Sequence, residues 1–267
     1  MPSVRHVDPL ADPRWDAYVR AHPLATTYHL SAWAAVLERA YGFRPRYLAL
    51  AGEDDRLRGV LPLMRKKGLI SDVRLRSIPV FSYGGPLGDS PAEESLLLQA
   101  ARDVSAHDER VRGMSINTGV RKLVADGFSS EEILPRWVLA LPDDLDALRA
   151  GWRKTSSNLF RSLKKTDSAA LRFREATSDR DLRSFHRLYT QTMRKHRSLP
   201  RSLRQVRVAR ELLGDGLKVF VVDHDGRDVA AGLYHVFGDT IELVYNGSED
   251  DALAMRPNHL LYWEVMR

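Results

Sequence analysis

Residues 219–235 read VFVVDHDGRDVAAGLYH, and this stretch decides the fold. An apolar run at 219–222 is followed by the pair Asp225-Gly226 and then by a second apolar run at 229–237. Each run has the length and the flanking residues of a β-strand, and an Asp-Gly pair between two such runs is typical of a hairpin. The stretch therefore predicts two antiparallel strands joined by a tight turn.

The first half of the chain contains the same pattern. Residues 47–63 read YLALAGEDDRLRGVLPL, again an apolar run, an acidic turn and a second run that follows a glycine. That glycine, Gly59, stands at a place that matches Gly232 in the later stretch. We therefore expect an internal duplication, with one domain at 1–141 and a second at 142–267.

Apolar periodicity and turn residues predict the remaining elements. In the first half, helices are predicted at 12–21, 32–39 and 90–107, and strands at 46–51, 57–64, 73–78, 114–117 and 137–141. In the second half, helical pattern covers 145–166 with a break near Gly151, and further helices are predicted at 178–195, 202–213 and 258–267. Strands are predicted there at 171–174, 218–222, 229–237 and 240–246.

The composition is that of a globular protein, because 43% of the 267 residues are hydrophobic and 28% are charged. The chain contains no cysteine, which excludes thiolate catalysis, disulfides and Cys-ligated metal sites. No apolar run reaches 18 residues, the N-terminus has no secretory signal, and no metal-ligand spacing such as HExxH occurs. We therefore expect a cytoplasmic protein with no metal and no spanning helix.

The positive charge is concentrated in the second half. Residues 149–174 hold eight Lys or Arg against one acid, and residues 194–210 hold seven with no acid. The formal net charge of the whole chain is +6, so the remainder is acidic. Two basic segments in an otherwise acidic chain favour an anionic partner such as a phosphate, a nucleotide-linked substrate, RNA or an anionic membrane surface. Two solvated helix faces without a ligand would give the same pattern.

Several short motifs occur in a characteristic order along nearly the whole chain. They are Trp33, Gly59–Leu63, Ser77–Pro79 followed by Tyr83–Leu87, Asn158–Lys165, Met193–His196 with Pro200, Tyr245–Ser248 and Pro257–Glu264. In this order and spacing, the sequence resembles the FemAB-related family of tandem GNAT-like (N-acetyltransferase-type) acyltransferases. The resemblance implies an α/β (α+β) fold of two GNAT-like units, each with a mostly antiparallel central sheet flanked by helices.

The resemblance also implies a function, namely transfer of an acyl or aminoacyl group to an amine. The acceptor would be an anionic carrier-linked substrate, a cell-envelope or exopolysaccharide precursor, and aminoacyl-tRNA is one implied donor. Peripheral association with the inner membrane stays open, as does the oligomeric state. Two alternatives remain: an acetyl-CoA-dependent GNAT N-acetyltransferase, and a non-catalytic RNA-binding or scaffold protein.

Two stretches depart from the family pattern. Where peptidoglycan-type members carry an Arg–apolar–Asp–Pro signature, this chain reads Ser115-Ile116-Asn117-Thr118-Gly119, which puts recognition of a cell-wall peptide in doubt. The sequence also stops at Arg267, before the family's C-terminal strands. We therefore expect the second GNAT-like unit to be C-terminally incomplete in this chain.

Four polar residues predict an anion-binding face. Lys154, Asn158, Arg161 and Lys165 recur at helical spacing and would lie on one side of a single helix, opposite Trp152 and its apolar neighbours. Their amide and cations suit phosphate groups. An exposed amphipathic helix is the competing interpretation.

Two further segments are candidate substrate-binding sites. In the loop Tyr83-Gly84-Gly85, the glycines would let backbone N–H groups approach a ligand closely, although a plain turn explains them as well. His196 stands beside Arg194 among cations that disfavour its protonation, so its imidazole could accept a proton. A surface histidine without a role is the alternative.

Candidate reacting groups lie near the C-terminus. Tyr245 and Asn246 end a predicted strand where GNAT-like folds place the chemistry, and such side chains can orient an amine or polarise a carbonyl. A packed aromatic side chain without a catalytic role is the competing interpretation. Asn258 and Tyr262 on the last helix are candidate binding residues, although Asn258 could serve as the N-cap and Tyr262 as core.

The loop after this strand bears on the donor. Acetyl-CoA-dependent GNAT proteins carry a glycine-rich pyrophosphate loop here, whereas this chain reads Gly247-Ser248-Glu249-Asp250-Asp251-Ala252. Three consecutive acids would repel a pyrophosphate. The sequence therefore disfavours acetyl-CoA, and no cofactor is expected.

Overall fold

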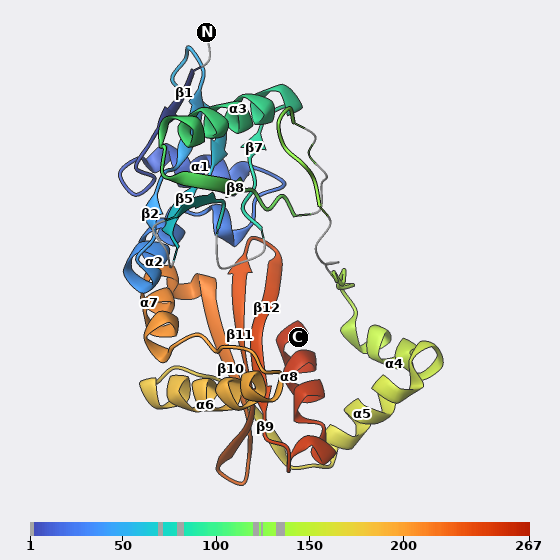
Figure 1. The fold of residues 1–267 in the computed structure, drawn as a ribbon. Helices are drawn as coiled ribbons and strands as arrows, with labels where there is room; N and C mark the ends of the chain where they lie inside the picture. The colour runs from blue at the N-terminus through green and yellow to red at the C-terminus, as the bar shows by residue number, and fades with distance from the viewer. Residues whose placement is uncertain (1–2, 69–71, 79–82, 120–122, 124, 132–136) are drawn as a thin grey trace. The chain divides into compact units, whose positions relative to one another are not determined.

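The computed structural model describes residues 3–68, 72–78, 83–119, 123, 125–131 and 137–267 (Figure 1). The chain divides into two compact units, residues 1–136 and 137–267. Both units combine helices with β-sheets, and all but one of the strand pairs in the described residues are antiparallel. The predicted α/β class with mostly antiparallel sheets is therefore confirmed.

The first unit contains two four-stranded sheets, ordered β1-β3-β4-β7 and β2-β5-β6-β8. Its elements are β1 (Ser3–His6), α1 (Pro13–Ala21), η1 (Thr27–His29), α2 (Ala32–Tyr41), β2 (Arg44–Pro45), β3 (Leu48–Ala51), β4 (Leu57–Leu61), β5 (Met64–Lys67), β6 (Val73–Arg76), β7 (Leu87–Gly88), α3 (Pro91–His107) and β8 (Val111–Ser115). The parallel pair is β6 with β8. Leucines of β3 and β4 pack with Leu97 and Ala101 of α3 to form the core.

The strand predicted at 57–64 is wrong as a single element, because the chain changes sheet in the middle of it. β4 ends at Leu61 and pairs with β3, whereas β5 begins at Met64 and pairs with β2 and β6. Pro62 lies at the break, and a proline cannot donate the N–H that a continuous ladder needs. One apolar run therefore supplies strands to two sheets.

The second unit contains one antiparallel sheet, ordered β12-β11-β10-β9. Its elements are α4 (Leu145–Thr155), α5 (Ser157–Asp167), β9 (Leu171–Glu175), α6 (Asp179–Lys195), α7 (Leu203–Leu213), η2 (Gly214–Gly216), β10 (Leu217–His224), β11 (Arg227–Phe237), β12 (Thr240–Ser248), η3 (Leu253–Met255) and α8 (Pro257–Met266). Val222 and Ala230 of the sheet form a buried cluster with Leu261 of α8. Helix α8 therefore covers one face of this sheet.

The two stretches that predicted a duplication both form antiparallel hairpins. These are β3–β4 in the first unit and β10–β11 in the second. Each hairpin has a register shift near its turn, between Leu50 and Ala51 in one and between Val222 and Asp223 in the other. These places correspond when the two 17-residue stretches are aligned from their first residues, but the same alignment sets Gly59 against Ala231, so the predicted match of Gly59 with Gly232 is off by one residue. The hairpins share a detail of register as well as their order.

Two predicted elements differ from the structure. The strand expected at 137–141 does not form: this segment pairs with no strand in the described part of the chain, and Trp137 is 93% exposed. Apolar alternation alone cannot make a strand without a neighbour to complete its hydrogen bonds. The helical stretch at 145–166 breaks at Ser156, whose φ of −150° and ψ of 65° are not helical, and not at Gly151.

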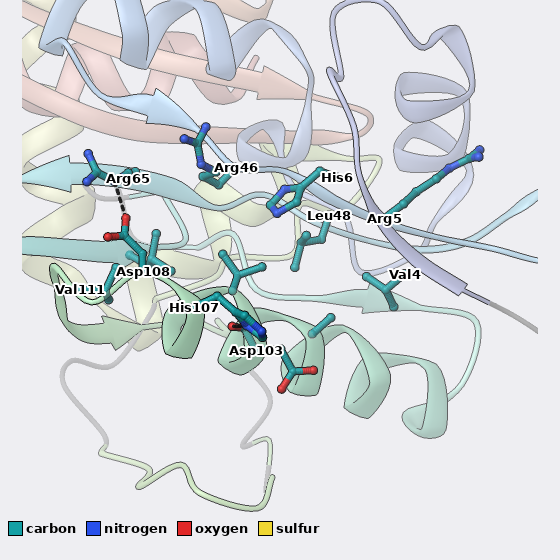
Figure 2. Close-up of a pocket in the computed structure, with 13 residues that line it drawn as sticks. Val4, Arg5, His6, Arg46, Leu48, Arg65, Asp103, His107, Asp108 and Val111 are labelled. Carbon is teal, nitrogen blue, oxygen red and sulfur yellow. Dashed lines mark hydrogen bonds and ion pairs between the residues drawn. The ribbon is translucent and has the colours of Figure 1, made fainter.

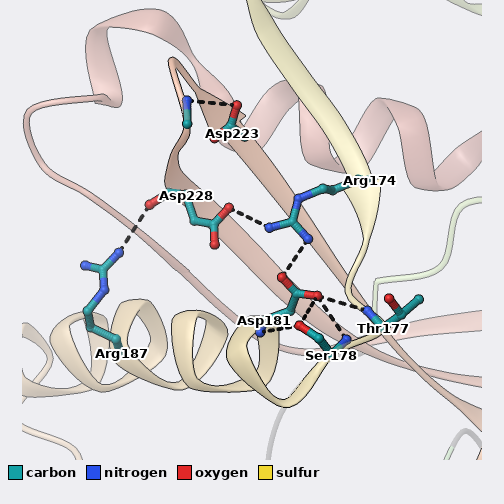
Figure 3. A network of polar contacts seen from close by, with 8 residues as sticks. Arg174, Thr177, Ser178, Asp181, Arg187, Asp223 and Asp228 are labelled. Atoms are coloured by element: carbon teal, nitrogen blue, oxygen red, sulfur yellow. Dashed lines mark hydrogen bonds and ion pairs between the residues drawn. The ribbon is translucent and has the colours of Figure 1, made fainter.

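The start of α6 is fixed by a polar network (Figure 3). Ser178 and Asp181 form a capping box, as their spacing predicts. The Asp181 carboxylate also accepts hydrogen bonds from the Thr177 N–H at 3.2 Å and from the Arg174 guanidinium at 2.7 Å. Arg174 in turn contacts Asp228 on β11 at 2.9 Å, so one arginine of the first basic segment joins strand β9 to α6 and β11.

Candidate active site

Successive residues of β12 point to opposite faces of the sheet. A Cβ built on Gly247 would lie 2.3 Å from the backbone of Leu188, so this residue faces α6. The Tyr245 ring faces the same way and lies 4.8 Å, centroid to centroid, from the ring of Tyr189. Asn246 faces α8 instead. The structure therefore does not bring the two proposed catalytic side chains, Tyr245 and Asn246, together on one surface.

On the face of β12 that packs against α8, two side-chain hydrogen bonds join the strand to the helix. The Asn246 amide Nδ2 donates to the Tyr262 hydroxyl at 2.8 Å, and the Asn258 amide Nδ2 donates to the Ser248 hydroxyl at 3.1 Å. The pattern arises because residues two apart on a strand share a face, as do residues four apart on a helix. Three predicted site residues, Asn246, Asn258 and Tyr262, therefore lie together.

Asn258 is not the N-cap of the last helix, so the alternative interpretation of this residue is wrong. Arg256, at a φ of 65°, holds the cap position and Pro257 is the first helical residue. Proline suits that position because its N–H would have no partner there in any case. The Asn258 side chain is thereby free to contact β12, and its Oδ1 is buried without a hydrogen-bond partner in the described residues.

Tyr234 lies beside these two hydrogen bonds, and it was not identified as a site residue from the sequence. Its ring covers Gly232, the partner of Asn246 across the β11–β12 ladder; a Cβ on that glycine would lie 2.7 Å from the ring. The side chain is only 3% exposed, and its hydroxyl has no partner among the residues that the structure describes. One signal in the sequence could have indicated Tyr234. A glycine, Gly232, stands two residues before this aromatic residue on the same strand and leaves room for its ring.

Both phenols on this face stay protonated at neutral pH. Burial raises the pKa of the Tyr262 hydroxyl. The pKa of Tyr234 is also raised, mainly by burial and to a smaller extent by the electrostatic effect of the nearby Tyr262. Tyr262 is 37% exposed, so its ring reaches solvent while Tyr234 lies beneath. Because Asn246 already donates to the Tyr262 oxygen, the hydroxyl hydrogen of Tyr262 can point to a bound molecule. The site can therefore donate hydrogen bonds to a polarised oxygen.

The opposite face of β12 is occupied by α6 and by the segment that precedes α7. The Tyr245 hydroxyl accepts from Arg201 Nε at 3.4 Å, and the Tyr189 hydroxyl accepts from the Arg201 backbone N–H at 3.1 Å. These contacts hold the segment between α6 and α7 against the sheet. The packed-aromatic interpretation of Tyr245 accounts for its contacts here.

The proposed cationic face on residues 154–165 is divided between two helices. Lys154 belongs to α4, whereas Asn158, Arg161 and Lys165 belong to α5, so the expectation of a single helical face is wrong. Asn158 and Arg161 are in contact through a side-chain hydrogen bond. All four side chains are exposed. They remain candidates for a surface that meets an anionic partner.

Apolar contacts attach these helices to the rest of the unit. The Trp152 ring lies edge-on to that of Trp263 on α8, 5.8 Å between centroids. The Arg149 guanidinium lies 5.4 Å from the same Trp263 ring and also pairs with Asp167 at 2.6 Å. Arg149, although part of the basic segment, therefore has a structural role.

Several cations of the second basic segment are also paired within the protein. Arg207 contacts Asp179 at 2.7 Å, Lys195 pairs with Asp250, and Arg210 donates to the Thr177 carbonyl. Arg194 and His196 are exposed at the end of α6, where the His196 N–H caps the helix. The field of this segment is weaker than its composition suggests because part of its charge is neutralised internally.

Each of the three acids after β12 has a cationic neighbour. Glu249 contacts Arg187 and Arg227, Asp250 contacts Lys195, and Asp251 contacts Arg227 at 2.8 Å. The first residue of α8 is a proline, which offers no N–H. A pyrophosphate would meet these paired carboxylates here, and the first residue of α8 offers it no N–H.

The glycines of the Tyr83 loop are explained by packing within the first unit. A Cβ on Gly84 would lie 2.2 Å from Ile78, and one on Gly85 would lie 3.0 Å from the Thr118 backbone. The Gly84 N–H donates to the Asn117 carbonyl, and the Gly85 carbonyl accepts from His29 at 3.0 Å. These backbone groups are engaged by the protein itself, and both glycines are buried.

Comparison with known proteins places this geometry in a class. Residues 153–267 match the family model described as an acetyltransferase (GNAT) domain. The crystal structure of FemX superposes with a TM-score of 0.73 at 15% sequence identity, covering 99% of this chain and 85% of that one. A tandem GNAT protein from the clavulanic acid biosynthesis pathway, solved without AcCoA, gives 0.49 at 12% identity over 98% and 85% of the two chains.

The second unit is therefore a GNAT-type domain, and the protein is an acyltransferase. The whole chain shares the fold of FemX, as the resemblance to the FemAB-related proteins implies. The sequence matches no curated protein. Among the described helices none is both long and apolar enough to cross a membrane.

Proposed function

We propose that the protein transfers an acyl or aminoacyl group to an amine, with the chemistry at the Asn246–Tyr262 pair. The observation that carries the proposal is the position of this pair on β12 and α8 of the GNAT-type domain, beside the buried, unpartnered hydroxyl of Tyr234. Asn258 and Ser248 fix the adjoining turn of α8 against the strand.

In the proposed reaction, the acceptor nitrogen attacks the carbonyl carbon of the donor ester. A C–N bond forms, the carbonyl oxygen takes negative charge, and the Tyr262 hydroxyl donates a hydrogen bond to that oxygen. Collapse breaks the C–O bond to the leaving alcohol, which takes up a proton as the ammonium loses one. Positioning and oxyanion stabilisation supply the rate, because neither an amide nor a protonated phenol is a base at neutral pH.

The proposed acceptor is an anionic, carrier-linked precursor of the cell envelope or of an exopolysaccharide, and the proposed donor is aminoacyl-tRNA. Exposed cations on α4 and α5, among them Lys154, Arg161 and Lys165, support an anionic partner. The acidic loop at 249–251 supports a donor other than coenzyme A.

The first experiment compares donors. The purified chain is incubated with a mixture of amine acceptors and with either aminoacyl-tRNA or acetyl-CoA, and amide products are identified by mass spectrometry. Product from aminoacyl-tRNA supports the proposal. Product from acetyl-CoA alone favours the N-acetyltransferase alternative, and tight tRNA binding without product under any condition favours a non-catalytic RNA-binding protein.

A second experiment separates binding from chemistry. We expect Lys154→Glu with Arg161→Glu to weaken tRNA binding at least tenfold, because charge reversal removes two contacts to phosphates. The control is Arg180→Glu with Arg183→Glu, an equal charge change at the exposed start of α6. Equal losses in both double variants would show a non-specific field and count against the α4–α5 surface.

A further inference from the structure

The first unit contains a cavity of about 450 Å³ that the proposed function does not use (Figure 2). Its walls come from β1, β3, β5, β6, α3 and β8. The volume lies within the range of small-molecule sites, about 300–1,000 Å³. Its lining is polar at one side and apolar at the other, which indicates the kind of molecule that would fit.

A partly buried arginine lies on the polar side. The Arg65 side chain is 15% exposed, and its Nε donates to Asp108 at 3.1 Å (Figure 2). The same carboxylate contacts Arg110 at 3.2 Å, and hydrogen bonds from Arg110 and Arg65 lower the pKa of Asp108 although burial opposes this. The single negative charge of Asp108 therefore neutralises only one of the two positive charges on Arg65 and Arg110.

Arg46 adds a second positive charge to this side. Its guanidinium donates to the Pro45 carbonyl at 3.0 Å and meets no carboxylate in the described residues. Burial, and then the charge of Arg46, lower the pKa of His6, so that this imidazole is neutral at pH 7. His6 can accept or donate a hydrogen bond there without adding charge.

The other charged groups of the lining do not cancel this excess. Arg5 pairs with Asp55 at 3.3 Å, outside the cavity. His107 hydrogen-bonds through Nδ1 to the backbone carbonyl of Asp103, one turn earlier on α3. The Asp103 carboxylate is the second acid of the lining. With Arg5 paired elsewhere, Arg46, Arg65 and the adjoining Arg110 face two carboxylates, Asp103 and Asp108, which leaves an excess of one positive charge.

The apolar side is part of the hydrophobic core. Leu48 and Leu75, which are 2% and 1% exposed, form it together with Val104 of α3 and Val111 of β8. A hydrocarbon chain placed there would contact side chains that are already dry, and burying each CH₂ is favourable.

We propose that this cavity binds a small carboxylate that carries a short hydrocarbon chain. The carboxylate lies against Arg46 and Arg65, whose planar guanidinium groups suit its two oxygens, and the chain lies over Leu48 and Leu75. The site is separate from the Asn246–Tyr262 pair, so it does not depend on the function proposed above.

The test is isothermal titration of the full chain with sodium hexanoate, sodium acetate and hexylamine in the same buffer. We expect saturable binding of hexanoate, at least tenfold weaker binding of acetate, and no binding of hexylamine. Equal affinities for hexanoate and hexylamine, or the absence of saturable hexanoate binding, would overturn the proposal. These comparisons use the unaltered protein, so they do not depend on how a variant folds.

Variants then locate the site. Arg46→Gln should weaken hexanoate binding at least fivefold, whereas Arg56→Gln, the same change on the exposed turn between β3 and β4, should leave it unchanged. Val104→Phe fills the apolar side and should abolish the preference for hexanoate over acetate. An equal effect of the two arginine substitutions would assign the binding to the general charge of the protein and reject the cavity.

Discussion

The side-chain amide of Asn246 donates a hydrogen bond to the phenolic oxygen of Tyr262 over 2.8 Å. The bond joins the last strand of the second unit to its last helix and orients the phenol. Since the amide supplies the hydrogen, the phenol keeps its own for another acceptor. Burial raises the pKa of Tyr262, so this donor remains available through the neutral range.

Removal of that donor should slow the chemical step. We expect Tyr262→Phe to lower kcat about 10- to 100-fold with little change in KM, because the lost hydrogen bond forms mainly to the developing oxyanion. The measurement is steady-state kinetics with the donor identified by mass spectrometry. Tyr189→Phe removes a hydroxyl on the opposite face of the sheet and should leave kcat unchanged; a similar loss in both variants would argue against Tyr262.

Loss of the carboxylate at the start of α6 should destabilise the second unit. Asp181→Asn weakens hydrogen bonds from Thr177, Ser178 and Arg174, and we expect the free energy of unfolding to fall by about 1–3 kcal/mol in urea. Asp225→Asn, on an 83% exposed side chain, should change it by less than about 0.5 kcal/mol.

The same carboxylate predicts a dependence on acid. Burial alone would raise its pKa, but hydrogen bonds from Ser178 and Arg174 lower the pKa of Asp181 from its ordinary value of 3.8 to about 2. A lowered carboxyl pKa stabilises the folded state above the unfolded value, and that stabilisation is lost as the pH falls. The difference between the native protein and Asp181→Asn should therefore shrink between pH 4 and pH 2. A constant difference across that interval would contradict this.

His29 predicts a second pH dependence, in the first unit. Burial lowers the pKa of His29 to about 4, and its ring contacts the Gly85 carbonyl and the Thr26 N–H. In the unfolded chain the His29 imidazole binds a proton near pH 6.5, whereas in the folded protein it stays neutral until the pH approaches 4. The free energy of unfolding therefore falls as the pH drops from 7.5 to 5. We expect a loss of about 2 kcal/mol between pH 7.5 and pH 5, measured by urea unfolding. His29→Gln should be less stable at pH 7.5 and should lose that part of the pH dependence.

Two glycines of the second unit should respond in opposite directions to alanine. Gly247→Ala would place a Cβ 2.3 Å from the backbone of α6 and should lower the free energy of unfolding by about 3 kcal/mol. Gly151→Ala on the exposed surface of α4 meets nothing within 4 Å and should raise it by about 0.5–1 kcal/mol. Thermal unfolding monitored by circular dichroism would separate the two. Equal effects would contradict the close approach of α6 and β12.

The elements that local sequence determines were predicted well. Both hairpins follow from apolar runs around acidic or Asp-Gly turns, and the capping box of Ser178 and Asp181 fixes the start of α6. The same holds for α3, which begins after Ser90 with Pro91 in its first turn. Such signals act over a few residues, so the sequence alone contains them.

Features that depend on packing were not predictable in this way. The helix break at Ser156 follows no glycine or proline, and the apolar segment at 137–141 has no neighbouring strand to pair with in the described part of the chain. At the candidate site, Asn246, Asn258 and Tyr262 were identified from their order along the chain. Tyr234 was missed, because only its position over Gly232 reveals it.

The ladder between β11 and β12 shifts register where Leu233 faces Tyr245 and Tyr234 faces Leu243, which leaves Val244 as one extra residue. This single insertion sets the parity of every later position, and so decides that an amide and not a phenol looks toward α8. If a sequence alignment of homologues placed the gap in this strand one residue too early or too late, it would match residues that face α8 with residues that face α6. Matching residues by chemical type alone would then assign the reactive position to a side chain that points away from it.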